Sequence, residues 1–544
     1  MNSTSFTLGT PSWITLVTDD GSHVAPFARR ETLPEDVAVD VADNASGGTV
    51  VSLSARTTAV RTVKLRWTRP MPKDARYLAD EWERSYGTMG FHGMLPNRIM
   101  PWYFLVVQGP STTGYGVKVR PNAMCLWQVD TAGITLVLDV RNGGEGVLLG
   151  GRRLDLAEIV AVTYEDVDSF NAAREFCRAM CDDPVLPDAP VYGSNNWYYA
   201  YGDSSEREIL ADADYLAELT EGNANRPFMV VDDCWQEHHR LDDYNGGPWR
   251  NGNDRFPDMA ALAAGIEARG VRPGIWVRFL LNEDESIPDE WRLPHNGCLD
   301  PTHPDAMAYI REDAETLCRW GYQLIKHDFS TFDLFGRWGF QMNPFVTADG
   351  WHLHDRSVTS AEAVKALYRT IFDVTQAHGA MVLGCNTIGH LGAGLMQLDR
   401  TGDDTSGVDW ERTRFNGVNT LAFRLPQHGT FFDTDADCVG IGDAIDWAKN
   451  RQWAEAIARS GTSLFFSAKP HTMAPQDEQD LREILAMSAA PQEHAIPLDW
   501  ELTDCPEEWE SELGMVRYDW YQPQGLAFGP RTNRGVSILT NIDE

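Results

Sequence analysis

Two short stretches decide the fold: Phe228-Met-Val-Val-Asp232-Asp233-Cys234-Trp235 and Leu324-Ile-Lys326-His-Asp328. In each, an apolar run stops at charged side chains. Runs of this length are typical of strands buried on both faces, as in a parallel sheet. In a barrel built from such strands, the active site lies at their C-terminal ends. The pattern therefore predicts a barrel whose functional rim carries these carboxylates.

The sequence around these stretches alternates short apolar runs with amphipathic helices. The expected strands are 191–197, 228–231, 271–279, 322–325 and 381–384, and the expected helices are 205–219, 259–269, 304–320 and 361–378. Repeated βα units at this spacing favour a (β/α)8 barrel over an open sheet. Candidates for the last strands are 395–398, 421–424 and 463–467. We assign residues 186–490 to this barrel.

The regions on either side of the barrel have a different pattern. Residues 1–185 are predicted to form an N-terminal β-sandwich with a linker helix at 166–181, because short β-type runs alternate with turn clusters such as 142–146. The β-type runs are 50–53, 62–67, 102–107, 124–129 and 134–140. Three prolines within 183–190 mark the boundary. Residues 491–544 are expected to form a small C-terminal β region that ends in a strand at 535–540.

Composition limits the classes of partner. The 46 Lys and Arg against 80 Asp and Glu leave a net charge of −34, which argues against nucleic acid and against an anionic membrane surface. With 43% apolar residues the chain has material for a packed core. The 19 Trp favour a small-molecule carbohydrate ligand, because indole faces suit sugar rings, although core packing explains them equally well.

The sequence also predicts a location. Residues 1–20 show no signal-peptide pattern, and no stretch of 18 apolar residues occurs, so we expect a cytoplasmic protein. Nine irregularly spaced cysteines do not make a disulfide framework, and we expect free, buried thiols. A homo-oligomer is compatible with the sequence.

Polar side chains follow several of the predicted strands. Asp232 and Asp233 form one adjacent pair, and Asp403 and Asp404 form another; Asp328 stands alone after Lys326. Carboxylates converging on one rim raise one another's pKa, which suits general acid and base catalysis, and a neighbouring cation would keep one of them ionised. Two plainer interpretations remain: the pairs cap the following helices, or the cations form structural ion pairs inside the barrel.

No metal or organic cofactor is expected. Cys177 and Cys181 lack a second ligand pair, and His352 and His354 have no glutamate pattern beside them. The two histidines fall in an aromatic-rich insertion, residues 330–360, which we expect to overhang the pocket or to join a neighbouring subunit.

Six motifs between Gly193 and Trp410 resemble those of the retaining α-galactosidases of glycoside hydrolase families 27 and 36. They are Gly193-Ser-Asn-Asn-Trp197-Tyr-Tyr, Asp232-Asp-Cys-Trp-Gln, Trp249 with Arg255-Phe-Pro257, Pro273-Gly-Ile-Trp276, Gly321-Tyr with Lys326-His-Asp-Phe329, and Arg400-Thr-Gly-Asp-Asp-Thr405. Their order and spacing agree as well as their residue types. Family 36 is the better match, because a β-sandwich is predicted before the barrel.

The resemblance implies roles for individual residues. It places the catalytic nucleophile on Asp328 and the acid/base on Asp404, with Asp403 as the rival, and it implies that Asp232 and Asp233 accept hydrogen bonds from O4 and O6 of galactose. The other substrate-binding residues that it implies are Trp197, Trp235, Trp276, Lys326, Cys385, Asn386 and Arg400. Asn386 departs from the glutamate, glycine or serine expected there, so recognition around O2 is left open.

These expectations amount to a retaining, exo-acting α-galactosidase-type hydrolase. Three alternatives stay open. An α-N-acetylgalactosaminidase or a β-L-arabinopyranosidase would use the same machinery, a transglycosylase resembling the raffinose synthases would transfer to a sugar hydroxyl, and a catalytically silent sugar-binding protein would keep the fold alone. The presence of both Asp328 and Asp404 argues against the last.

Overall fold

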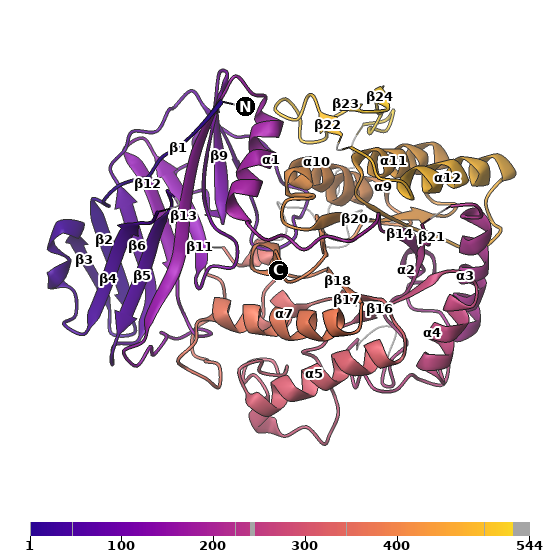
Figure 1. Ribbon diagram of the computed structural model, residues 1–544, viewed down its shortest axis with the longest axis horizontal. Helices are drawn as coiled ribbons and strands as arrows, with labels where there is room; N and C mark the ends of the chain where they lie inside the picture. Colours follow the sequence, from indigo (N-terminus) through magenta and orange to yellow (C-terminus); the bar gives the residue numbers. More distant parts are fainter. Residues whose placement is uncertain are drawn as a thin grey trace.

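The computed structural model describes residues 2–45, 47–223, 225–239, 245–343, 345–493 and 495–525. It contains an N-terminal pair of antiparallel sheets, a closed eight-stranded parallel barrel and a small three-stranded C-terminal sheet. In Figure 1 the sandwich lies on the left, the barrel on the right and the yellow C-terminal sheet above them. The predicted fold class is confirmed.

The N-terminal sandwich packs two sheets against each other. One sheet has the order β4-β5-β13-β10-β9-β7 with β1 paired to β13, and the other has the order β3-β2-β6-β12-β11-β8. The strands are β1 (Asn2–Ser5), β2 (Trp13–Thr18), β3 (Ser22–Pro26), β4 (Val37–Asp43), β5 (Thr49–Ala55), β6 (Val60–Trp67), β7 (Arg76–Ala79), β8 (Met100–Pro101), β9 (Tyr103–Gln108), β10 (Ser111–Val117), β11 (Met124–Asp130), β12 (Gly133–Asp139) and β13 (Arg153–Glu165). The five runs expected from sequence all fall on these strands.

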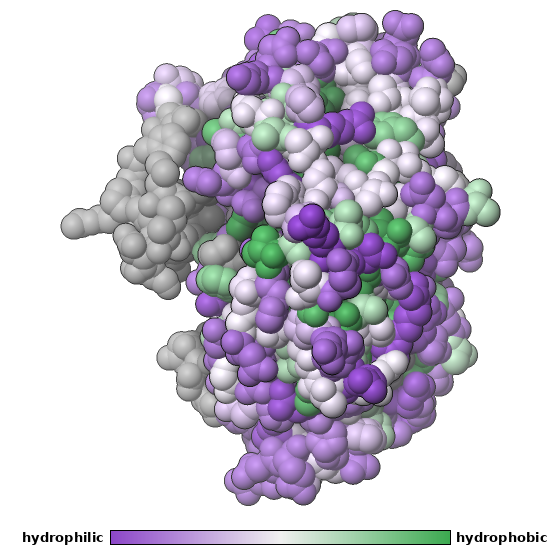
Figure 2. All heavy atoms as spheres, turned by 90° about the vertical axis from the view of Figure 1, so that its left-hand side faces the viewer, coloured by the Kyte–Doolittle hydropathy of each residue, from purple (hydrophilic) through white to green (hydrophobic). Residues whose placement is uncertain are grey.

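Alternation along the strands explains why the sheets pair. In β2, Ile14 and Leu16 are fully buried while Trp13 faces outward, which is the period of two expected when one face of a sheet meets a core. Viewed from the sandwich end, the surface is mostly hydrophilic, with apolar residues in small separate groups (Figure 2).

Helix α1 (Ser169–Met180) connects the sandwich to the barrel and matches the predicted linker helix. Asp168 caps it by accepting a hydrogen bond from the Asn171 amide at 2.8 Å. The helix lies close against β10 because Gly114 has no side chain; a Cβ there would stand 2.4 Å from the Phe176 ring.

The barrel closes in the order β14-β15-β16-β17-β18-β19-β20-β21. Its strands are β14 (Tyr192–Asn195), β15 (Phe228–Val231), β16 (Arg272–Val277), β17 (Leu324–His327), β18 (Met381–Gly384), β19 (Leu398–Arg400), β20 (Asp433–Ile441) and β21 (Ser463–Ala468). The larger surrounding helices are α3 (Glu206–Leu219), α4 (Met259–Glu267), α5 (Pro304–Arg319), α7 (Ser360–Ala377), α11 (Trp447–Ser460) and α12 (Pro475–Ser488). The first five predicted strands and four predicted helices are confirmed, with ends shifted by a few residues.

Two of the late strands differ from expectation. The 421–424 segment belongs to helix α10 (Thr420–Arg424), and the seventh strand is β20. Its sequence, Asp-Thr-Asp-Ala-Asp-Cys-Val-Gly-Ile, hid it, because three acids interrupt the apolar run. Asp437 is tolerated inside the barrel because it pairs with Arg400 at 2.9 Å. Burial raises the pKa of Asp433 to about 7 and that of Asp435 to about 6, which moves both toward their neutral forms. The sixth strand begins at Leu398, where the predicted 395–398 segment ends.

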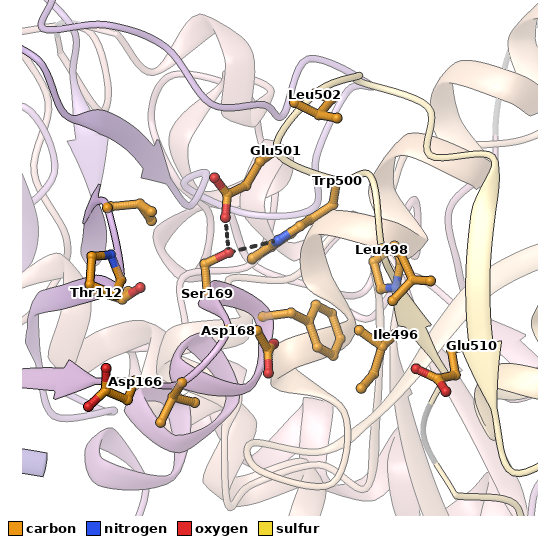
Figure 3. A pocket seen from close by; sticks show the side chains of 16 residues that line it. Thr112, Asp166, Asp168, Ser169, Ile496, Leu498, Trp500, Glu501, Leu502 and Glu510 are labelled. Carbon is orange, nitrogen blue, oxygen red and sulfur yellow. Dashed lines mark hydrogen bonds between the residues drawn. The ribbon is translucent and has the colours of Figure 1, made fainter. Parts of the chain in front are cut away.

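The C-terminal sheet consists of β22 (Ile496–Pro497), β23 (Glu508–Ser511) and β24 (Gly514–Arg517). The strand expected at 535–540 lies outside the described residues. A hollow of about 660 Å3 separates this region from the sandwich and α1. On its wall, Trp500 Nε1 donates to Ser169 Oγ at 3.0 Å and Ser169 donates to Glu501 (Figure 3). This hollow lies between the C-terminal region, the sandwich and α1, and none of the strand-end carboxylates described below lines it.

Within the described ranges, no helix has the length and apolar character needed to cross a bilayer.

Candidate active site

The carboxyl ends of alternate barrel strands bring the predicted carboxylates to one rim. Asp232 follows β15, Asp328 follows β17, and Asp403 and Asp404 follow β19. Directly after the first two strands, Cys234 (102°) and Phe329 (63°) have positive φ, and so does Asp437 (72°) within β20. A positive φ is unfavourable for residues with a Cβ, and such strain concentrates at functional sites. The backbone is thus forced to turn directly after the acids.

The carboxylate of Asp328 is buried and held by named donors. Trp276 Nε1 donates to Oδ2 at 2.9 Å, and Asn386 Nδ2 donates to Oδ1 at 2.7 Å. Burial alone would raise the pKa of this carboxyl, but Arg84, Lys326 and these hydrogen bonds outweigh it and lower the pKa below its ordinary value. Asp328 is therefore an ionised carboxylate, the form that a nucleophile needs.

Asp232 and Asp233 have different surroundings although they are adjacent. Lys326 Nζ bonds to Asp232 Oδ2 at 2.7 Å, and Asn195 donates to the same oxygen. Asp233 accepts from Gln236 Nε2 at 2.7 Å and from the Cys234 amide. Burial, with the nearby charge of Asp232, raises the pKa of Asp233 to about 7.

Lys326 therefore differs in position from the simplest expectation. It forms its ion pair with Asp232 rather than with Asp328, its neighbour in sequence, and it acts on Asp328 only through its charge. Arg400 likewise has its shorter contact, 2.9 Å, with Asp437 and a longer one, 3.3 Å, with Asp404. The structural ion pairs that the sequence left open are present, and they lie inside the site.

The helix-capping interpretation is wrong for both acid pairs. Helix α4, the first helix that the structure describes after Asp232 and Asp233, is capped by Asp258. Helix α9 (Trp410–Thr413), which follows the second pair, is capped by Asp409. The two pairs are thus not needed to start the following helices.

Asp404 lies among cations. Its Oδ1 is 3.4 Å from Arg84 Nη1 and 3.3 Å from Arg400 Nη2, and its side chain is 37% exposed. Burial opposes ionisation of Asp404, but Arg84, Arg400 and Arg412 outweigh it and hold the pKa well below the usual range. Asp403 is more enclosed, with 11% of its side chain exposed, and bonds to Arg84 Nη2 at 2.5 Å.

Arg84 is one of two site residues that sequence reasoning missed. It comes from the segment between β7 and β8 of the sandwich, more than 300 residues from Asp403 and Asp404 in the chain. The available signal was weak: residues 80–99 form a long connection carrying charged and aromatic side chains, and such loops often carry function. Asp437, hidden by its acidic strand, was missed as well.

The predicted aromatic and sulfur residues divide into two groups. Trp276 touches Asp328, and Cys385 Sγ accepts from Arg400 Nη1 at 3.4 Å. Trp197, the first residue of α2 (Trp197–Ala200), is half-buried and packs on the barrel's inner cluster. Trp235 is fully buried and donates to the Trp276 carbonyl at 2.9 Å, so it supports Trp276 from behind.

The aromatic insertion covers the same rim. The centroid of the Trp338 ring lies 4.6 Å from that of Phe332 and 5.6 Å from that of Phe329, the residue after Asp328, and both ring pairs are tilted. The insertion also packs against the sandwich of its own chain: the Gly339 amide donates to Glu83 at 2.7 Å. This placement agrees with the predicted overhang of the pocket.

One group of potential metal ligands lies beside these acids. Asp233, Cys234 and His239 present ligand atoms within 4.8 Å of one another. The Asp233 carboxylate already accepts two hydrogen bonds, and burial raises the pKa of the Cys234 thiol, which disfavours the thiolate that binds metals. The donor chemistry therefore suits a hydrogen-bonding site better than a metal centre.

The clustered acids and fixed cations lie at the strand ends of a (β/α)8 barrel, where the active sites of such barrels are built, and comparison with known proteins indicates the kind of enzyme. No protein-family model matches the chain. A probable α-galactosidase A of Aspergillus terreus is 27% identical over 152 residues, 28% of this chain and 25% of that protein. The match thus spans about a quarter of the relative's length.

Solved structures extend the likeness to most of the chain. An α-galactosidase from Thermus thermophilus, determined with p-nitrophenyl α-D-galactopyranoside, has a TM-score of 0.58 at 17% identity and covers 88% of this chain and 99% of that one. The family 36 α-galactosidase AgaA of Geobacillus stearothermophilus gives 0.54 at 15% identity, covering 88% and 75%. At such identities the structures establish the shared fold. By sequence and architecture together, the chain resembles the α-galactosidase-type glycoside hydrolases.

Proposed function

We propose that the protein is a retaining glycoside hydrolase that removes terminal α-galactosyl-type residues from oligosaccharides or glycosides. The observation that carries this proposal is that an ionised Asp328 and Asp404 lie on the same rim of the barrel, in a chain that resembles α-galactosidases. Sugar-bound relatives of the same fold support a carbohydrate substrate.

The proposed reaction has two steps. A carboxylate oxygen of Asp328 forms a bond to the anomeric carbon while the bond from that carbon to the leaving oxygen breaks. Asp404 gives a proton to this oxygen, and it must first take up that proton from solvent, because the cations around it favour its ionised form. Water then attacks the same carbon, Asp404 takes up a proton from the water, and the ester to Asp328 breaks. Two inversions at one carbon leave its configuration unchanged.

Asp232 and Asp233 account for the choice of sugar in this proposal. Asp232 is fixed by Lys326 and Asn195, and Asp233 by Gln236. Carboxylates held in place can accept from O4 and O6 of one sugar, and inverting O4 would leave a buried acceptor without its donor, which is costly. We therefore expect a strong preference for galacto- over gluco-configured substrates.

A second candidate function is transfer to a sugar hydroxyl instead of water. The observation that favours it is the aromatic group Phe329, Phe332 and Trp338 beside the catalytic rim, which offers ring faces to an acceptor sugar. Transfer would use the same glycosyl-Asp328 intermediate and differ only in what attacks it.

The test is a hydrolysis screen with nitrophenyl α-galactoside, α-N-acetylgalactosaminide, β-L-arabinopyranoside and α-glucoside, followed by product analysis with and without added raffinose or sucrose. We expect the α-galactoside to be fastest and the first sugar released to be the α-anomer. Release of the β-anomer would contradict retention, and comparable rates on galactoside and glucoside would contradict the sugar assignment. New oligosaccharides formed with an acceptor present would favour transfer.

A cytoplasmic location belongs to the same proposal. All nine cysteines are free and buried, as expected, which fits a reducing compartment. A homo-oligomer stays a prediction, for which light scattering is the direct measurement.

A further inference from the structure

The segment that carries Arg84 is fastened to the barrel at several points. Asp80 pairs with Arg424 at 2.7 Å and accepts from Gln427 at 2.9 Å. The Ser85 amide donates to the Thr401 carbonyl at 2.9 Å, and the Asp403 amide donates to the Ser85 carbonyl at 2.8 Å. The sandwich therefore presents this short segment to the β19 rim in a fixed register.

The side chain of Arg84 projects from this segment toward Asp403 and Asp404. Its side chain is only 5% exposed. One guanidinium nitrogen bonds to Asp403 at 2.5 Å, and the other lies 3.4 Å from Asp404 and 3.9 Å from Cys385 Sγ. A planar guanidinium with two fixed contacts cannot turn freely, so Asp403 holds the charge that faces Asp404.

Asp404 meets charged or titratable groups from every element around it. Arg84 reaches it from the sandwich, Arg400 from β19, Arg412 from α9 and Lys326 from β17. Tyr198 of α2 and Asp437 of β20 also face this cluster, the first within range of the Asp404 charge and the second through Arg400. Among these groups Arg84 alone comes from outside the barrel.

We propose that Arg84, clamped by Asp403, is a positioning residue for Asp404 and sets the upper pH limit at which Asp404 can donate its proton. Asp403 then has a defined role as the anchor of Arg84 rather than as the acid/base. The kinetic test of this inference rests on the proposed hydrolysis. Its second test, thermal unfolding, needs only the contact between Arg84 and Asp403.

The physical reason lies in the two opposite duties of Asp404. A cation beside a carboxyl stabilises the ionised form, which helps Asp404 to accept a proton from water and hinders it from giving one to the leaving group. Removing the cation makes the protonated acid persist to higher pH. A purely structural Arg84 would lower stability when removed and would leave this limit unchanged.

The decisive experiment measures kcat/KM against pH for the wild type, Arg84→Gln and Arg84→Lys with an α-galactoside whose leaving group needs protonation. In Arg84→Gln we expect the basic limb to move to higher pH by about one unit, since a neighbouring Arg lowers a carboxyl pKa by about 1–3 units and Arg400 remains. Arg84→Lys keeps a cation and should restore most of the shift.

Asp80→Asn is the matched control. It breaks a buried Asp–Arg pair that fastens the same segment to the barrel, but it removes no group beside Asp404. We expect it to lower Tm and to leave the basic limb in place. An unshifted limb in Arg84→Gln, or an equal shift in Asp80→Asn, overturns the proposal.

Thermal unfolding tests the clamp without any activity. If Asp403 holds Arg84, the double variant Arg84→Gln/Asp403→Asn should have a Tm no lower than that of the less stable single variant, because the two residues share one interaction. Additive losses overturn the clamp. A wild type inactive on the whole glycoside panel refutes the proposed function instead, and the unfolding result still decides whether Asp403 anchors Arg84.

Discussion

The chain carries two adjacent Asp–Asp pairs at barrel strand ends, and the fold treats them in opposite ways. At Asp232–Asp233 the barrel supplies one cation, Lys326, which bonds to Asp232 and leaves Asp233 with a pKa raised to about 7 by burial. At Asp403–Asp404, Arg84 and Arg400 lie against the pair, and the pKa of Asp404 falls well below the usual range although partial burial opposes its ionisation.

The difference shows that the pKa values of these acids depend more on which part of the fold supplies the neighbouring cation than on the sequence of the acids. Lys326 lies on β17, so any barrel with this strand would present it. Arg84 reaches the second pair only because the sandwich packs on the barrel and its segment pairs with Thr401 and Asp403. The Asp232–Asp233 pair, which we propose binds the sugar, is thus built by the barrel alone. The Asp403–Asp404 pair, which we propose contains the proton donor, is completed by Arg84 of the sandwich.

Asp328 lies between these pairs, and its removal should have the largest effect. In Asp328→Ala we expect turnover to fall at least about a thousandfold, because covalent catalysis normally supplies several kcal/mol. Added azide or formate should restore part of it by entering the vacated space. The check is the steady-state rate on an activated aryl α-galactoside; a variant that keeps more than about a tenth of the wild-type rate would rule out the nucleophile role.

The second pair is tested by leaving groups. Asp404→Ala should slow a poor leaving group about 100-fold or more and an activated aryl galactoside much less, because the activated group needs little protonation, and its pH profile should lose the basic limb. Asp403→Ala is the matched neighbour and should not show this dependence on leaving group. The reverse outcome would assign the acid/base to Asp403.

The first pair is tested by sugar configuration. Asp233→Asn should lower kcat/KM for galactoside about 10- to 100-fold, the value of a hydrogen bond to a charged group, and should narrow the gap between galactoside and glucoside. Removing C6, as in the arabinopyranoside, should be tolerated better than inverting C4. An Asp233→Asn variant with lower Tm and an unchanged sugar preference would reduce the pair to a structural turn.

The smallest effect concerns stability against pH. Because the pKa of Asp233 is raised to about 7 in the folded state, the native protein holds a proton between about pH 4 and 7 that the unfolded chain releases, so this residue makes stability fall as pH rises through that window. Asp233→Asn removes that loss. Its Tm relative to wild type should therefore rise by roughly 5 °C between pH 4.5 and 7.5.

Asp404→Asn is the comparison for that measurement. The folded-state pKa of Asp404 is lowered, so its ionised form stabilises the protein above about pH 4 and the benefit is lost only at lower pH. Its Tm difference from wild type should stay constant between pH 4.5 and 7.5. Equal pH trends in the two variants would mean that the two pairs share one electrostatic environment.

The sequence by itself determined the barrel, the sandwich before it and the acids on the rim. Apolar runs ending in Asp232 and Asp328 sufficed, because burial of parallel strands and the placement of polar residues at their ends are local consequences of the pattern. Strand β20 was missed for the opposite reason: one of its acids, Asp437, is stabilised by Arg400, a partner that a local pattern does not reveal.

Only the tertiary structure decided which cation faces which acid. Lys326 turns to Asp232 rather than to Asp328, two positions away, and Arg84 comes to Asp403 and Asp404 from a separate domain. The strength of an electrostatic interaction depends on the distance between the charges and on their burial, and neither follows from their separation in the sequence. Most carboxylates and cations of the site could therefore be predicted from the sequence, whereas their protonation states were decided by how the folded chain packs around them.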